Sequence, residues 1–252
     1  MEQSFIAYIE NSIKQNWDLD ALTDYKGATL QYKDVARKIE KLHIIFEASG
    51  IRKGDKIAVC GRNSSHWGVT FLATLTYGAV IVPILHEFKA DNVHNIVNHS
   101  EAELLFVTDA IWEHIQPENL LNIKAAISLK RRSESLYQRD DINVQRCISM
   151  LRRRFKRRYP EGFGPDDVIY EAWPNNRLME INYTSGTTGF SKGVMLLGNN
   201  LAGNVLFGIS QRLHYRGSRV LGFLPLAHAY GCAFDMPVSY THLRAHETSQ
   251  DL

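Results

Sequence analysis

The chain has 252 residues, of which 44% are hydrophobic and 22% are charged, and its formal net charge is +2. This composition excludes a disordered or collagen-like chain and is typical of one large globular domain or two small ones. Its three cysteines, Cys60, Cys147 and Cys232, are far apart and form no C-x-x-C pair, which favours reduced thiols in a cytoplasmic protein over disulfides or a zinc site.

Residues 1–5 show no signal peptide, and an amphipathic helix is expected from Phe5 because Phe5, Ile9 and Ile13 recur every four residues. Strands and helices then alternate, which predicts an α/β fold with parallel-sheet layers covered by helices on both faces. The expected elements are strand 28–32, helix 32–49, strand 56–60, helix 64–77, strand 79–84, helix 90–99, strand 104–107 and, after a gap, strand 178–183.

One uncharged run, from Trp67 to Leu85, is long enough as a helix to cross a membrane. It is punctuated by Gly68, Gly78 and Pro83, and its second half is rich in β-branched residues. The pattern therefore favours a helix that ends near Gly78 and leads into a buried strand, rather than a membrane span.

The segment 130–158 is strongly basic, with eleven lysines and arginines against three acidic residues. A solvated helical hairpin is one interpretation of this segment. Peripheral contact with an anionic membrane surface is the alternative with a function, because clustered basic side chains are attracted to such surfaces. No RNA-binding or DNA-binding motif accompanies the charge, so no nucleic-acid partner is expected.

Residues 183–194 form a glycine-rich and hydroxyl-rich loop that ends near a lysine and follows an apolar run. Glycines let backbone amides approach an oxyanion, hydroxyls donate to phosphate or bind Mg²⁺, and lysine adds a positive charge. The loop therefore predicts a polyphosphate site, with an ordinary surface loop as the alternative. The residues concerned are Thr184, Ser185, Gly186, Thr187, Thr188, Gly189, Ser191, Lys192 and Gly193.

The spacing excludes two common phosphate loops. A Walker loop requires Gly directly before the lysine and Ser or Thr directly after it, whereas Ser191 precedes Lys192 and Gly193 follows it. No G-x-G-x-x-G sequence is present, which excludes the Rossmann and kinase glycine loops.

Residues 183–194 resemble the phosphate-loop signature of the adenylate-forming superfamily of acyl-CoA synthetases, peptide-synthetase adenylation domains and luciferases. The usual proline before the lysine is replaced by Ser191, a position that affects loop stiffness and carries no chemistry. Residues 224–231, Leu-Pro-Leu-Ala-His-Ala-Tyr-Gly, resemble the next core motif of that superfamily, and residues 50–67 give a weaker third match. Their order is most similar to that of long-chain fatty acid–CoA ligases.

The resemblance implies an enzyme that uses ATP, Mg²⁺ and coenzyme A to activate a fatty acid. It places the backbone and hydroxyls of 185–189 on the phosphates, Lys192 beside the β and γ phosphates, and the Thr184 hydroxyl on Mg²⁺. His228 is expected between the acyl pocket and the thiol tunnel; a buried structural histidine is its alternative. An enzyme for aryl or amino acids and a non-catalytic nucleotide-binding fragment are the alternative functions.

The resemblance runs from about residue 5 to about residue 236, and residues 1–236 are expected to be part of an AMP-binding (adenylation) domain. The superfamily's later motifs and its C-terminal catalytic lysine have no match here, so no catalytic residue beyond phosphate stabilisation by Lys192 is expected, and the chain alone is expected to be inactive. Residues 237–252 depart abruptly from the superfamily pattern and are expected to be a foreign tail.

Overall fold

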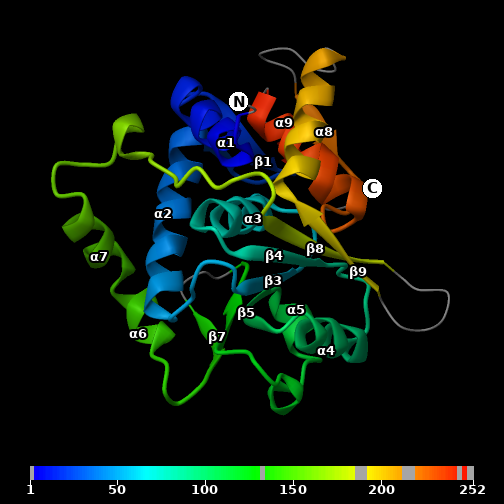
Figure 1. Cartoon of the computed structure of the whole chain (residues 1–252). Helices are drawn as coiled ribbons and strands as arrows, with labels where there is room; N and C mark the ends of the chain where they lie inside the picture. Colours follow the sequence, from blue (N-terminus) through cyan, green and yellow to red (C-terminus); the bar gives the residue numbers. More distant parts are fainter. Residues whose placement is uncertain (1–2, 131–133, 185–191, 212–218, 243–245, 249–252) are drawn as a thin grey trace.

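The computed structural model describes residues 3–130, 134–184, 192–211, 219–242 and 246–248. A seven-stranded sheet runs through the centre of the molecule (Figure 1). Its strands, in spatial order, are β7 (Ser135–Gln138), β6 (Ala125–Ser128), β5 (Ala102–Val107), β3 (Lys56–Cys60), β4 (Val80–Ile84), β8 (Leu178–Thr184) and β9 (Lys192–Leu197).

A second, four-stranded sheet lies beside the main sheet and consists of β10 (Val220–Gly222), β11 (His246–Thr248), β1 (Asp20–Asp24) and β2 (Thr29–Gln31). The α-helices are α1 (Phe5–Gln15), α2 (Tyr32–Ala48), α3 (Ser65–Tyr77), α4 (Ala90–His99), α5 (Asp109–Trp112), α6 (Val144–Ser149), α7 (Leu151–Arg158), α8 (Gly198–Ser210) and α9 (Met236–His242). Two 3₁₀ turns, η1 (Pro117–Asn119) and η2 (Pro165–Asp167), and one π-helix, η3 (Gly231–Asp235), complete the described elements.

The expected parallel sheet is confirmed for its interior, where β6, β5, β3, β4 and β8 pair in parallel. Both edge strands differ from that expectation, because β7 and β9 are antiparallel to their neighbours. Each follows its partner strand along the chain after a short connection, and a short connection between paired strands produces an antiparallel hairpin.

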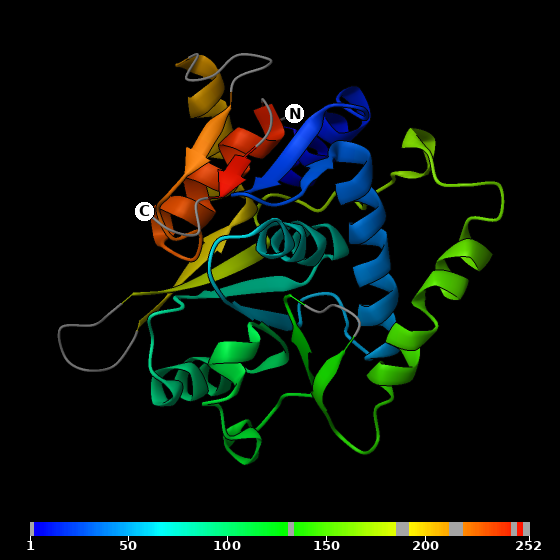
Figure 2. The same cartoon turned by 180° about the vertical axis from the view of Figure 1, so that it is seen from behind.

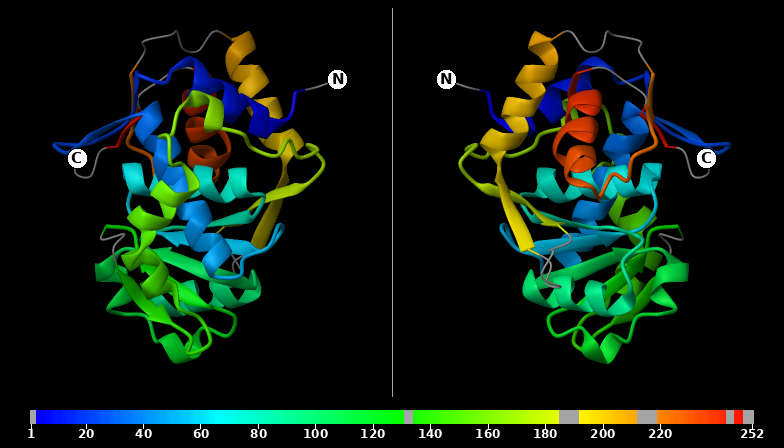
Figure 3. Two further views of the ribbon diagram at one scale, coloured as in Figure 1. Left: turned by 90° about the vertical axis from the view of Figure 1, so that its left-hand side faces the viewer. Right: turned by 90° about the vertical axis from the view of Figure 1, so that its right-hand side faces the viewer.

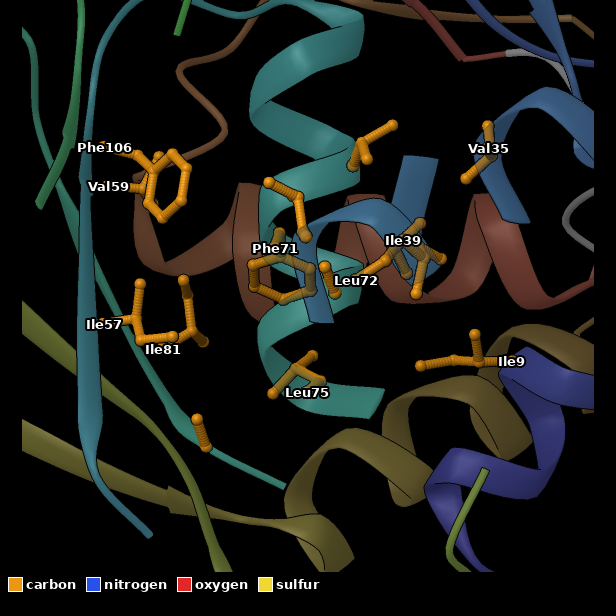
Figure 4. Packing of buried hydrophobic residues seen from close by; sticks show 14 of the residues in the cluster. Ile9, Val35, Ile39, Ile57, Val59, Phe71, Leu72, Leu75, Ile81 and Phe106 are labelled. Atoms are coloured by element: carbon orange, nitrogen blue, oxygen red, sulfur yellow. The ribbon is translucent and has the colours of Figure 1, made fainter. Parts of the chain in front are cut away.

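Alternating side chains of the central strands lie on opposite faces of the sheet. Ile57 and Val59 join the core formed with α2 and α3, whereas Ala58 and Cys60 join the core formed with α4. Figure 4 shows Ile57 and Val59 beside Phe71 of α3. Seen from behind and from the sides, α1, α8 and α9 lie together beyond α3 (Figures 2 and 3). The fold is therefore layered, with helices on both faces of the main sheet.

The uncharged run 67–85 divides as its sequence predicts. Helix α3 begins where the Ser64 hydroxyl accepts a hydrogen bond from the Trp67 amide, and it ends at Gly78, which has a left-handed φ of +84°. Strand β4 follows and is buried along its length. In the described ranges, no helix is long and apolar enough to cross a membrane.

Only the second half of the segment 130–158, for which a helical hairpin was expected, is helical in the described residues. In the described part of that segment, strand β7 precedes helices α6 and α7, which follow each other with only Met150 between them. Strand β7 forms because β6 has an open edge that accepts it.

Residues after Met236 continue into helix α9, where Val238 and Tyr240 are buried. The Tyr240 carbonyl accepts hydrogen bonds from the Ser12 hydroxyl at 2.8 Å and the Tyr32 hydroxyl at 3.0 Å. The foreign origin of residues 237–252 stays a prediction.

Candidate functional site

The predicted phosphate loop connects the two strands of a hairpin. Thr184, the last residue of β8, pairs with Lys192, the first residue of β9, and both side chains are exposed. Residues 185–191, which include Ser185, Gly186, Thr187, Thr188 and Gly189, lie outside the described residues. The structure thus brings the proposed Mg²⁺ ligand and the proposed phosphate cation together across one rung of the ladder.

Close packing near the loop end of this hairpin requires a glycine. A Cβ atom on Gly193 would lie 2.9 Å from Cγ2 of Ile181 and 3.2 Å from Cζ of Tyr183. The Tyr183 hydroxyl is in turn 2.7 Å from Nδ1 of His99. Strand β9 therefore lies directly over the side chains of β8, which fixes the position of Lys192 at its start.

Strand β8 also carries a buried polar cluster that the sequence did not identify. Oε1 of Glu180 accepts a hydrogen bond from the Cys232 thiol at 2.6 Å and lies 3.3 Å from Nδ2 of Asn182. The Asn182 amide donates to the Cys232 sulfur at 2.9 Å and approaches the Ala227 carbonyl at 3.4 Å. The cluster therefore connects the strand that leads into the predicted phosphate loop to the segment that contains His228.

The carboxyl group of Glu180 is in an unusual electrostatic environment. Its side chain is fully buried, and its Oε2 atom has no hydrogen-bond partner among the described residues. Burial raises the pKa of Glu180 to about 7, against the lowering effect of the bonds from Cys232 and Asn182. Burial, followed by the adjacent Glu180 carboxylate, raises the pKa of the Cys232 thiol well above its usual value. Burial therefore disfavours the ionised form of both groups, and Glu180 changes its charge near neutral pH.

A second polar contact fixes the chain before His228. The Asn63 side chain donates to the carbonyls of Gly222, at 3.0 Å, and Leu224, at 2.7 Å, and its Oδ1 accepts from the Leu226 amide at 2.7 Å. Asn63 belongs to the third of the three sequence matches, and residues 224–231 belong to the second. One buried amide side chain therefore links two motifs that are far apart in the sequence.

His228 is exposed, so its interpretation as a buried structural histidine is wrong. Its amide donates to the Pro225 carbonyl at 2.9 Å, and its own carbonyl accepts from the Cys232 amide at 3.0 Å, which places it in the turn before η3. An apolar groove of about 500 Å³ lies next to this turn, lined in part by Leu221, Phe223 and Tyr230.

Metal binding by the residues themselves has little support. Within the described ranges, no group of three or more histidine, cysteine, aspartate or glutamate side chains is placed to hold a metal ion. The exposed hydroxyl of Thr184 opposite Lys192 fits a different arrangement, in which a metal ion arrives bound to a polyphosphate that supplies most of its oxygen ligands.

Comparison with known proteins shows what this arrangement resembles. Long chain acyl-CoA synthetase 1 of Arabidopsis thaliana is 26% identical over 207 residues, which is 78% of this chain and 30% of that protein. A 4-coumarate–CoA ligase-like protein of the same plant is 27% identical and is matched over 37% of its length, covering 87% of this chain. The chain thus spans about a third of the curated relatives it matches.

Solved structures share the fold. A long-chain-fatty-acid–CoA ligase from Archaeoglobus fulgidus superposes with a TM-score of 0.74 at 19% identity, covering 98% of this chain and 47% of that one. ATP-bound MatB from Rhodopseudomonas palustris gives a TM-score of 0.75 at 18% identity, covering 99% of this chain and 45% of its own. The family model described as AMP-binding enzyme matches residues 9–243, and the chain therefore belongs to the AMP-binding enzyme family.

Proposed function

We propose that this chain supplies the ATP-binding part of an enzyme that activates a long-chain fatty acid, first as an acyl adenylate and then as an acyl-CoA. In the first step a carboxylate oxygen attacks the α-phosphorus of ATP, and the bond to pyrophosphate breaks. In the second step the thiolate of coenzyme A attacks the acyl carbon, and AMP leaves with the electrons of the acyl–oxygen bond.

The observation that carries this proposal is the pairing of Thr184 with Lys192 at the loop end of the β8–β9 hairpin. The ammonium group of Lys192 would stabilise the charge that develops on the departing pyrophosphate. Mg²⁺ bound to that pyrophosphate would neutralise further charge, with the Thr184 hydroxyl as its protein ligand. The backbone and hydroxyls of residues 185–189 are proposed to hold the phosphates.

The choice of a fatty acid is supported by the names of the relatives and by the apolar groove beside the His228 turn. An apolar groove suits an alkyl chain, which gains free energy when it leaves water. We propose that His228 lies between this groove and the approaching thiol. An aryl acid is the alternative substrate, because a 4-coumarate–CoA ligase-like protein is also among the relatives.

Isothermal titration of the chain with Mg·ATP tests the proposal. Replacement of Lys192 by alanine is expected to weaken ATP binding about 10-fold to 100-fold, since a charge-assisted hydrogen bond contributes about 1.5–3 kcal/mol. Lys89→Ala is the matched control, because Lys89 is exposed at the start of α4 and is expected to leave ATP binding unchanged. Fatty acid binding should be affected less than ATP binding; equal loss of both would contradict the assignment of Lys192.

Substrate class requires a second assay, made on the longest natural protein that contains this chain. Hydroxylamine trapping of the activated acyl group is expected to be faster with palmitate than with 4-coumarate. Faster trapping with 4-coumarate would support the aryl alternative, and ATP binding without any trapping would support a non-catalytic nucleotide-binding role.

A further inference from the structure

A basic groove lies between the C-terminal half of α2 and helix α7. It has a volume of about 710 Å³, and four arginines of α7 line it, namely Arg153, Arg154, Arg157 and Arg158. In Figures 1 and 2, α7 lies alongside α2 and on the opposite side of the molecule from the β8–β9 hairpin. The groove is therefore separate from the proposed ATP site.

Most of the charge in this groove is unbalanced. Among the described lining residues, Glu47 is the one acidic residue, and its carboxylate forms an ion pair with Arg158. Arg153, Arg154 and Arg157 are exposed and have no carboxylate partner within the described ranges. Three guanidinium groups on one short helix are thus available to an anion.

The helix that carries these arginines is anchored on its apolar side. Phe155 packs against Tyr159, with ring centroids 5.1 Å apart, and against Phe163 at 5.6 Å. Nζ of Lys41, on α2, lies 5.3 Å from the centre of the Phe155 ring. The arginines are consequently presented from a fixed helix, which reduces the entropy lost when they bind an anion.

The surroundings of Lys41 give an independent sign of positive potential. Burial, together with the nearby charges of Arg152 and Arg37, lowers the pKa of Lys41. Burial is the larger cause, and the like charges of Arg152 and Arg37 add to it, because these side chains lie close enough to Lys41 to disfavour its protonated form. An anion bound there would reduce this repulsion.

We propose that the groove between α2 and α7 binds the phosphate groups of anionic phospholipids and so holds the protein at a membrane surface. Guanidinium groups match phosphate oxygens with paired hydrogen bonds. The groove also has apolar lining residues, Ile44, Ala48 and Met150, directly beside the arginines. This combination suits a lipid, whose phosphate is attached to apolar chains, better than a fully hydrated soluble phosphate. The proposal does not depend on the proposed enzymatic function.

Sedimentation of the chain with phospholipid vesicles tests the proposal. The chain is expected to bind vesicles that contain phosphatidylglycerol and not to bind vesicles of pure phosphatidylcholine. Its binding should weaken as salt is added. The triple variant Arg153→Gln, Arg154→Gln, Arg157→Gln is expected to lose about five-fold in partitioning for each arginine, and about 100-fold in all. Because the three side chains are exposed, the variant should keep the circular dichroism and melting temperature of the wild type.

The matched control is the triple variant Lys26→Gln, Arg52→Gln, Lys89→Gln, which removes the same charge from exposed positions outside the helices and strands. It is expected to retain most of the binding; an equal loss in both triple variants would overturn the proposal in favour of a general charge effect. Release of the bound protein by inorganic phosphate at constant ionic strength would overturn the lipid assignment in favour of a soluble phosphate. Binding to a polynucleotide but not to vesicles would also overturn it.

Discussion

The buried carboxyl of Glu180 should make the stability of this protein fall as the pH rises. Its pKa in the folded state is about 7, above the ordinary value of 4.5, because burial penalises the ionised form. A group whose pKa is raised by folding contributes stability that is fully present below its unfolded pKa and is lost as the pH rises through its folded pKa. The loss should therefore occur between about pH 4.5 and about pH 7.

The size of this effect follows from the displacement of the pKa. At about 1.4 kcal/mol per pKa unit, a rise from 4.5 to about 7 corresponds to about 3 kcal/mol of unfolding free energy. Glu180→Gln removes the titration and keeps a side-chain oxygen that can accept the bond from the Cys232 thiol. The difference in unfolding free energy between variant and wild type should therefore shift by about 3 kcal/mol in favour of the variant from about pH 4.5 to about pH 8.

Urea denaturation of both proteins across that pH range measures this difference. Because the comparison is between pH values, a constant cost of the glutamine amide group cancels. Glu118→Gln is the control, since Glu118 is exposed and its replacement removes the same formal charge at the surface. A difference between Glu180→Gln and wild type that stays constant with pH would refute the argument, as would an equal shift in the Glu118→Gln control.

Three further predictions concern packing and the segment before His228. Asn63→Ala should destabilise the chain by about 3 kcal/mol, because two carbonyls and an amide lose their hydrogen-bond partner. Asn63→Asp should cost more, because a carboxylate would face those two carbonyls. Urea denaturation measures both variants, and an Asp variant as stable as wild type would contradict this reasoning. Gly78→Ala should lower stability by about 2–4 kcal/mol, because φ is +84° and the new Cβ would lie 2.7 Å from Nε1 of Trp173. Gly162→Ala should cost only about 1 kcal/mol, because φ is also positive, at +107°, but no described atom lies within 4 Å of the new Cβ. Equal melting temperatures of the two variants would contradict the role of the Trp173 contact. Phe223 is 66% exposed beside the apolar groove and should promote self-association of the chain. Phe223→Ser is therefore expected to lower the molar mass measured by light scattering toward that of the monomer. An unchanged molar mass would exclude a self-association contact at Phe223.

Local sequence signals predicted much of the central fold. Helix α3 and strand β4 follow from Ser64, which caps the helix, and from Gly78, which ends it. Strand β3 has the bounds, residues 56–60, that the sequence predicts. The antiparallel edge strands did not follow from such signals, because their pairing depends on which edges of the sheet remain open.

The sequence likewise predicted some residues of the candidate site and missed others. Thr184 and Lys192 were identified from their motif, and the hairpin brings them together. Glu180 stands alone as an acidic residue in an apolar strand, which is a signal for a special role, but its partner Cys232 is 52 residues away in the chain. The role of Asn63 could not be predicted for the same reason, because its partners are about 160 residues away.

Affinity labelling with an acyl phosphate of ATP tests the central claim most directly. The reagent transfers its acyl group from the terminal phosphate to a lysine amine beside the bound phosphates, and peptide mass spectrometry then identifies that lysine. We expect Lys192 to be labelled and to be protected by excess Mg·ATP, whereas exposed lysines such as Lys89 should be labelled without protection. An ATP-protected label on another lysine, with Lys192 unmodified, would contradict the placement of the phosphates at the β8–β9 hairpin.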